Sequence, residues 1–121
     1  MKRLYLTEMA RVGEFNNFKV SVYECEGLIS HFHIYKGNLK KPEFHSCIRI
    51  DINEYFLHGN KLDILNSKQR KDLMEWLLSN NEDLDVSNYT AIIILWNMNN
   101  RKLKLNKDRE IPNYLELKWK N

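Results

Sequence analysis

Ser30-His31-Phe32-His33-Ile34-Tyr35 and Glu43-Phe44-His45-Ser46-Cys47-Ile48-Arg49-Ile50-Asp51 are the stretches that decide the predicted fold. Both alternate strictly, and a β-strand points successive side chains to opposite faces of its sheet. A hairpin joining them through residues 36–42 would have one apolar face, formed by Phe32, Ile34, Phe44, Ile48 and Ile50. The opposite face would carry Asp51 and six residues that we call the histidine face, namely His31, His33, Tyr35, His45, Cys47 and Arg49.

The composition describes an ordinary globular protein. The chain has 121 residues, of which 43% are hydrophobic and 29% are charged, and its formal net charge is +3. These values predict a single domain over residues 1–121 with one core, and an extended tail from about residue 101. A charge this small does not by itself indicate a nucleic-acid-binding protein.

Cysteine usage and hydropathy bear on the compartment. Cys25 and Cys47 form no disulfide framework, and they fit a reducing environment. No apolar run is long enough to span a bilayer, and Thr7 and Glu8 interrupt any signal-peptide core. We therefore expect a cytoplasmic protein with no membrane partner.

The N-terminal part predicts a further strand at residues 18–23, which alternate and are rich in β-branched and aromatic side chains. Keeping Phe18, Val20 and Val22 on the core face predicts Val20 opposite Phe32. The connecting loop would then be Cys25-Glu26-Gly27, with Gly27 in the left-handed conformation. The preceding residues 3–12 fit either a short helix or a strand, and residues 13–17 predict a turn.

The second half predicts at least one helix. Asn66 or Ser67 can cap it, and Gln69 completes a capping box with Asn66. Its apolar residues have helical spacing, which places Trp76 in the core. The apolar run 90–96, which includes Trp96, fits a buried strand or a buried helix. The tail predicts an extended segment anchored by three residues, Leu115, Leu117 and Trp119.

Several short motifs resemble a known family. They are His31-Phe32-His33, Cys47-Ile48-Arg49-Ile50, Tyr55-Phe56-x-His58-Gly59, Glu75-Trp76-Leu77 and Leu95-Trp96-Asn97-x-Asn99-Asn100. Over residues 28–100 the chain resembles a family of small uncharacterised bacterial and phage proteins with a His-Phe-His strand. Relatives occur in mobile elements, some in toxin–antitoxin-like gene pairs. Many members have proline before the first histidine, where this chain has Ser30.

The resemblance favours a helix over residues 90–98 and implies a fold outline without a settled activity. Together with the patterns above, it predicts an α+β fold. An antiparallel sheet of about three to four strands would be packed on one face by two helices.

The histidine face suggests a metal site. The His-x-His and His-x-Cys spacings each project two ligands to one face, and imidazole with thiolate suits zinc. Pairing His33 with Cys47, and Tyr35 with His45, would bring three ligands together. Against this, no acidic residue lies among them, and neighbouring hairpin positions splay outward. We therefore expect no metal and no cofactor. The plainer alternative is that some histidines pack against the N-terminal segment or the tail, with both cysteines as small hydrophobes.

The function we expect is that of a small accessory or interaction protein of a mobile element or phage, such as one component of a toxin–antitoxin-like pair. A protein partner would bind the six residues of the histidine face, treated as an open sheet face. The interface would also draw on tyrosines, namely Tyr23, Tyr35, Tyr55 and Tyr89.

The alternative is a metal-free ribonuclease. His31, His33 or His45 would be its general base, and Arg49 with Lys40 or Lys41 would stabilise the phosphate. The basic loop 36–41, beside Tyr35, fits RNA, but 16 acidic residues offset the 19 basic ones. We therefore expect no enzymatic activity, and a protein rather than a nucleic acid as the partner.

Overall fold

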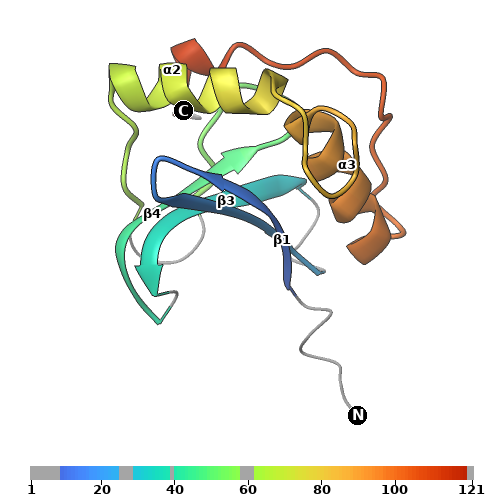
Figure 1. Ribbon diagram of the computed structural model, residues 1–121, viewed down its shortest axis with the longest axis horizontal. Helices are drawn as coiled ribbons and strands as arrows, with labels where there is room; N and C mark the ends of the chain where they lie inside the picture. Colours follow the sequence, from blue (N-terminus) through green and yellow to red (C-terminus); the bar gives the residue numbers. More distant parts are fainter. Residues whose placement is uncertain (1–8, 25–28, 39, 58–61, 120–121) are drawn as a thin grey trace.

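The computed structural model describes residues 9–24, 29–38, 40–57 and 62–119, which form a four-stranded antiparallel sheet contacted by two helices (Figure 1). This is the predicted α+β class. The elements in chain order are β1 (Met9–Phe15), β2 (Phe18–Tyr23), β3 (His31–Asn38), β4 (Lys41–Arg49), α2 (Ser67–Leu78), α3 (Asn88–Asn99) and the 3-10 turn η1 (Tyr114–Glu116). The strands lie side by side in sequence order.

The core lies between the apolar face of the sheet and the two helices. Of the residues predicted on the core face of the strands, Phe44 is partly buried and the others are buried, namely Phe18, Val20, Val22, Phe32, Ile34, Ile48 and Ile50. Leu73, Leu77 and Trp96 are buried with them, while Trp76 and Leu95 are partly buried against the same cluster. Both tryptophans are therefore core residues, as predicted.

The strand register is correct for one hairpin and shifted for the other. His33 pairs with Cys47 and Tyr35 with His45, as expected. Val20, however, pairs with Ile34 and not with Phe32. A shift of two residues leaves every side chain on its predicted face, because the side-chain period of a strand is two. The β2–β3 connection is therefore longer than predicted, and the proposed loop Cys25-Glu26-Gly27 lies outside the described residues.

The turns at the ends of β1 and β3 also differ from the prediction. β1 continues through Gly13, with a bulge between Arg11 and Gly13, and the turn is limited to Asn16 and Asn17. Their φ values are 47° and 69°, as in the tight turns that suit hairpin twist, and asparagine tolerates this conformation. The predicted loop 36–42 is mostly strand, because β3 reaches Asn38 and β4 begins at Lys41.

The helix α2 begins as predicted. The side chain of Asn66 accepts a hydrogen bond from the backbone N–H of Gln69. The side chain of Gln69 accepts one from the backbone N–H of Asn66, so the capping box forms. The ambiguous run 90–96 is helical, and Ser87 caps its helix. No helix among the described ranges is long and apolar enough to cross a membrane.

The tail is anchored mainly by a residue that was not predicted. Tyr114 is fully buried, and its hydroxyl donates to the carbonyls of Arg49 and Ile50 at the end of β4. Leu115 is 44% exposed, so its prediction as an anchor is wrong. Leu117 does pack against the core, and Trp119 contacts the ring of Tyr55.

Candidate functional site

The six residues of the histidine face share one side of the β3–β4 hairpin, but that side is not open. They form three cross-strand pairs, His31 with Arg49, His33 with Cys47, and Tyr35 with His45. His31, His33, Tyr35 and Cys47 are at most 4% exposed, and His45 and Arg49 are partly buried. The expectation of an open binding face is therefore wrong. Tyr55 and Tyr89 are buried as well, so they offer no interface.

His31 is held as an internal packing residue. Its Nδ1 lies 2.8 Å from the carbonyl of Ile29, which only accepts, so Nδ1 carries the proton. Its ring packs 4.5 Å from Phe56 and 5.7 Å from Trp96, measured between ring centroids. This arrangement agrees with internal packing of a histidine, although these partners are neither the N-terminal segment nor the tail.

The guanidinium of Arg49 forms ion pairs with two acidic neighbours, Asp51 and Glu54. It donates to both carboxylate oxygens of Asp51, at 2.9 and 2.7 Å, and its NH1 lies 3.6 Å from Glu54. The hydrogen bonds that Arg49 donates to Asp51 raise the pKa of Arg49. Burial works to raise the pKa of Asp51, but the hydrogen bonds and charge of Arg49, with the charge of Arg109, hold it below its usual value. The guanidinium is therefore a structural cation at the end of β4.

A compact cluster of three donor atoms lies at the centre of the histidine face. Nδ1 of His33 is 2.9 Å from Nε2 of His45 and 3.2 Å from Sγ of Cys47. Sγ of Cys47 is 3.8 Å from Nε2 of His45. The expected outward splay is wrong for this set. Cys47 faces His33 directly, and the long imidazole of His45 reaches back along the diagonal between the strands.

Hydrogen bonds between the neutral side chains of this cluster use at most two of its three contacts, as when Nδ1–H of His33 donates to Sγ of Cys47 and the thiol donates to Nε2 of His45. An imidazole nitrogen either donates one proton or accepts through one lone pair, never both. If Nδ1 of His33 donates to His45, it has no lone pair for the thiol of Cys47. If it accepts, both neighbours compete for the same lone pair. At most two of the three contacts are thus hydrogen bonds, whereas one metal ion takes a lone pair from all three atoms.

The separations also fit a metal ion. Zinc–nitrogen bonds of about 2.0–2.1 Å and zinc–sulfur bonds of about 2.3 Å, set tetrahedrally, place two nitrogens about 3.3 Å apart and nitrogen and sulfur about 3.6 Å apart. The three observed contacts, 2.9, 3.2 and 3.8 Å, bracket these values. Small side-chain rotations would therefore complete the site without moving either strand.

The backbone around the cluster is fixed by a residue that the sequence did not single out. Asp63 accepts from the backbone N–H of His45 through its carboxylate, at 2.9 Å, and donates its own N–H to the carbonyl of His45, at 2.8 Å. These two bonds hold the outer edge of β4 at the position of a candidate ligand. Nothing in the local sequence pattern marks this long-range contact.

No protein-family model, curated protein or solved structure matches the chain. The resemblance drawn from the His-Phe-His motif therefore stays a prediction.

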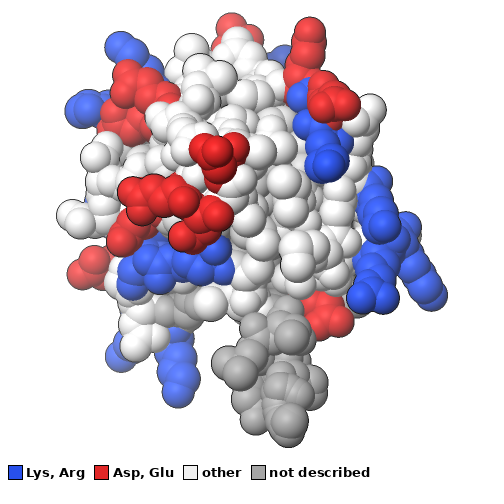
Figure 2. Space-filling model, turned by 45° about the vertical axis from the view of Figure 1, so that its right-hand side comes forward, with Lys and Arg blue, Asp and Glu red and all other residues white. Residues whose placement is uncertain are grey.

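The same geometry gives the ribonuclease alternative little support. The facing nitrogens of His33 and His45 are in hydrogen-bond contact, which leaves no space for a phosphate between them. Arg49 and Lys41 lie at opposite ends of β4, about 26 Å apart along the strand, so they cannot hold one phosphate together. On the face shown in Figure 2, most acidic side chains adjoin basic ones, and uncharged surface separates these small charged groups from one another. That face therefore has no continuous basic track for a nucleic-acid backbone.

Proposed function

We propose that this protein binds one zinc ion through Nδ1 of His33, Nε2 of His45 and Sγ of Cys47. The observation that supports the proposal is the convergence of these three atoms, all within 4.8 Å of one another. It reverses the expectation from the sequence that no metal is bound. That expectation rested on the lack of an acidic residue among the ligands, which still holds for this set, and on outward splay, which the structure contradicts.

The donor set favours zinc over harder cations. Two imidazoles and one thiolate suit zinc, whereas magnesium and calcium require oxygen ligands. Copper also accepts this donor set, so it is the competitor to test.

The site has an unusual polar neighbour. Ser21 pairs with His33 across β2 and β3, and its hydroxyl is buried without a hydrogen-bond partner. A buried polar group without a partner costs about 1–3 kcal/mol. A ligand or water in the outer shell of the ion would provide that partner.

The expected consequence of zinc is stabilisation of the folded protein, because the ligands come from two strands and are largely buried. An ion that binds only the folded state stabilises it by about 4 kcal/mol when its free concentration is about a thousand times its Kd. The role of an interaction protein with a protein partner stays a prediction, and it is compatible with a zinc-stabilised sheet.

The test is to measure the metal in protein purified without an affinity tag. We expect close to one zinc ion per chain, and a fall in melting temperature when a chelator removes it. Cobalt substituted for zinc should give a thiolate-to-metal absorption band that is absent in Cys47→Ser. Acidification should release the metal, since protons compete for all three ligands.

Two variants serve as matched controls. Ser46→Ala changes the adjacent residue on the opposite face, where a buried hydroxyl has no partner, and His31→Gln removes a histidine outside the cluster. Both should keep their zinc, whereas His33→Ala and Cys47→Ser should lose it. Protein that takes up no zinc or copper, or that keeps zinc in both ligand variants, would refute the proposal.

A further inference from the structure

A second feature of the surface, separate from the zinc site, is a groove beside the end of α3. It has a volume of about 680 Å³, and it lies between the last turns of the helix and the segment 101–107. The residues lining it are Ile94, Asn97, Met98, Arg101, Lys104, Leu105, Asn106 and Lys107.

The groove is built by specific hydrogen bonds. Asn97 donates to the carbonyl of Leu105 at 2.9 Å and accepts from its N–H at 2.7 Å, so one side chain holds the segment along the helix. Trp96, which is fully buried, adds a bond of 3.0 Å from its indole N–H to the carbonyl of Leu103. The groove is therefore preformed in the folded protein.

The lining combines an apolar floor with a basic rim. Ile94 and Leu105 are partly buried, and Met98 is 66% exposed although it is a large apolar residue. The rim carries three exposed cations, Arg101, Lys104 and Lys107. Within the described part of the chain none of these three forms an ion pair.

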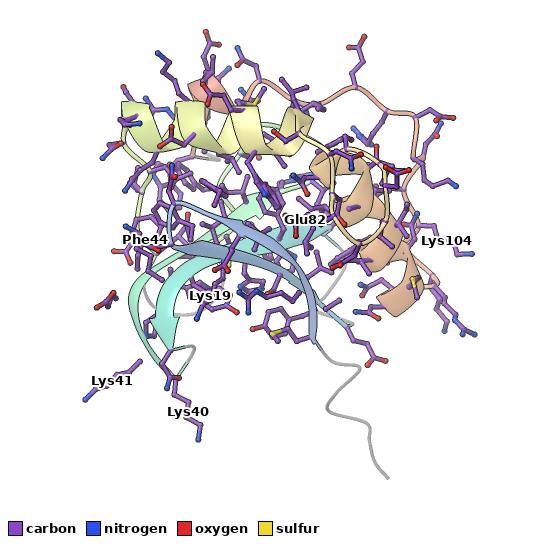
Figure 3. All side chains as sticks on the ribbon, viewed as in Figure 1. Lys19, Lys40, Lys41, Phe44, Glu82 and Lys104 are labelled. Carbon is purple, nitrogen blue, oxygen red and sulfur yellow. The ribbon has the colours of Figure 1, made fainter. Side chains whose placement is uncertain are left out.

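Stabilisation of α3 by cations near its C-terminus explains only part of the positive charge on the rim of the groove. Cations near a helix C-terminus interact favourably with the helix dipole, but the effect falls off within the last turn. α3 ends at Asn99, so Arg101 is close enough, whereas Lys104 and Lys107 are several residues further along the chain. Lys104 stands out from the body of the protein beside α3 (Figure 3).

We propose that this groove binds an acidic, leucine-containing segment of a partner protein. Carboxylates would meet the three cations, and an apolar side chain would cover the floor at Met98. RNA fits less well, because none of the lining residues is aromatic and base stacking supplies much of the affinity for single strands.

A second copy of the chain fits less well too. Among the residues that the structure describes, an acidic stretch around an exposed leucine lies at residues 82–85. There the side chain of Asn81 accepts from the N–H groups of Asp83 and Leu84, each at 3.0 Å, and Asp85 has a φ of 53°. This stretch is folded into a tight turn and cannot lie extended in a groove.

The test measures binding of labelled probes by fluorescence anisotropy. The probes are a short peptide of alternating glutamate and leucine, its lysine–leucine counterpart, and oligouridine. We expect the acidic peptide to bind and the other two to bind at least about tenfold more weakly. Affinity for the acidic peptide should fall as salt is added.

Charge reversal supplies the matched comparison. Arg101→Glu with Lys104→Glu should weaken binding of the acidic peptide at least about tenfold, because like charges would then face each other. Lys40→Glu with Lys41→Glu makes the same net change at the tip of the β3–β4 hairpin, away from α3, and should change affinity less than about twofold (Figure 3).

Four results would overturn the proposal. They are no binding of the acidic peptide, equal losses in the two double variants, preference for oligouridine, and self-association that the groove variant abolishes. Zinc content should be the same in both double variants, so failure here and failure of the zinc proposal are distinguishable.

Discussion

Ile48→Ala tests the separation of the two faces of the sheet. Ile48 is fully buried, lies opposite Phe32 on one side and forms a bridge to Tyr55 on the other. Because hydrogen bonds hold the backbone on both sides, the site cannot collapse into the space left by the removed carbons. Ile→Ala changes in cores cost about 2–5 kcal/mol, and the cost rises with the cavity that remains. We therefore expect a loss of about 3–4 kcal/mol in the free energy of unfolding.

The assay is urea unfolding monitored by tryptophan fluorescence, because Trp76 and Trp96 lie in or against the core and their emission changes when it unfolds. Ile64→Ala is the matched control, since Ile64 is 54% exposed and its removal should cost less than about 1 kcal/mol. An equal loss at both positions, or a loss below about 1 kcal/mol at Ile48, would show that the packing argument is wrong.

Two further predictions concern a close contact and alkaline stability. Gly13→Ala should cost about 1–3 kcal/mol, measured by the same unfolding assay, because the added carbon would lie 2.9 Å from Cζ2 of Trp76. Burial raises the pKa of Tyr89 to about 12 and that of Tyr114 well above its usual value. The folded state therefore keeps protons that the unfolded state loses above about pH 10, so stability should fall by about 1.4 kcal/mol per pH unit for each tyrosine as pH rises from 10 towards 12. Melting curves of Tyr89→Phe across this range should show a shallower fall; an unchanged slope would contradict it.

Local sequence patterns were sufficient for the fold because each depends on neighbouring residues. Alternation placed Ile34 and Ile48 on the core face, and the capping box at Asn66 located the start of α2. Patterns were insufficient where distant segments meet. The alternation of side chains is compatible with several registers that differ by two residues. It therefore could not distinguish Phe32 from Ile34 as the partner of Val20.

Burial of the histidine face could not be predicted for the same reason, because it also depends on how distant segments meet. Alternation shows only that His33 points away from the helices, not whether other parts of the chain cover it. One residue that packs against His33 is Tyr23 of the neighbouring strand β2, whose ring centroid lies 4.5 Å from that of His33. A polar face that is covered in this way does not serve as an open binding surface, and its substitutions are expected to cost stability as well as function.

The convergence of the three donor atoms could not be read from spacing alone, because spacing fixes where Cα atoms lie and side-chain rotation fixes where the donors meet. His45 and Cys47 are two residues apart on β4, and the same spacing is common in strands that bind no metal. What distinguishes this pair is His33 opposite them, with its Nδ1 within 3.2 Å of both donors. Hydrogen bonds between neutral side chains use at most two of the three contacts, whereas a zinc ion would take a lone pair from all three atoms. The convergence of the three donor atoms within 4.8 Å of one another is therefore the observation on which the proposed metal site rests.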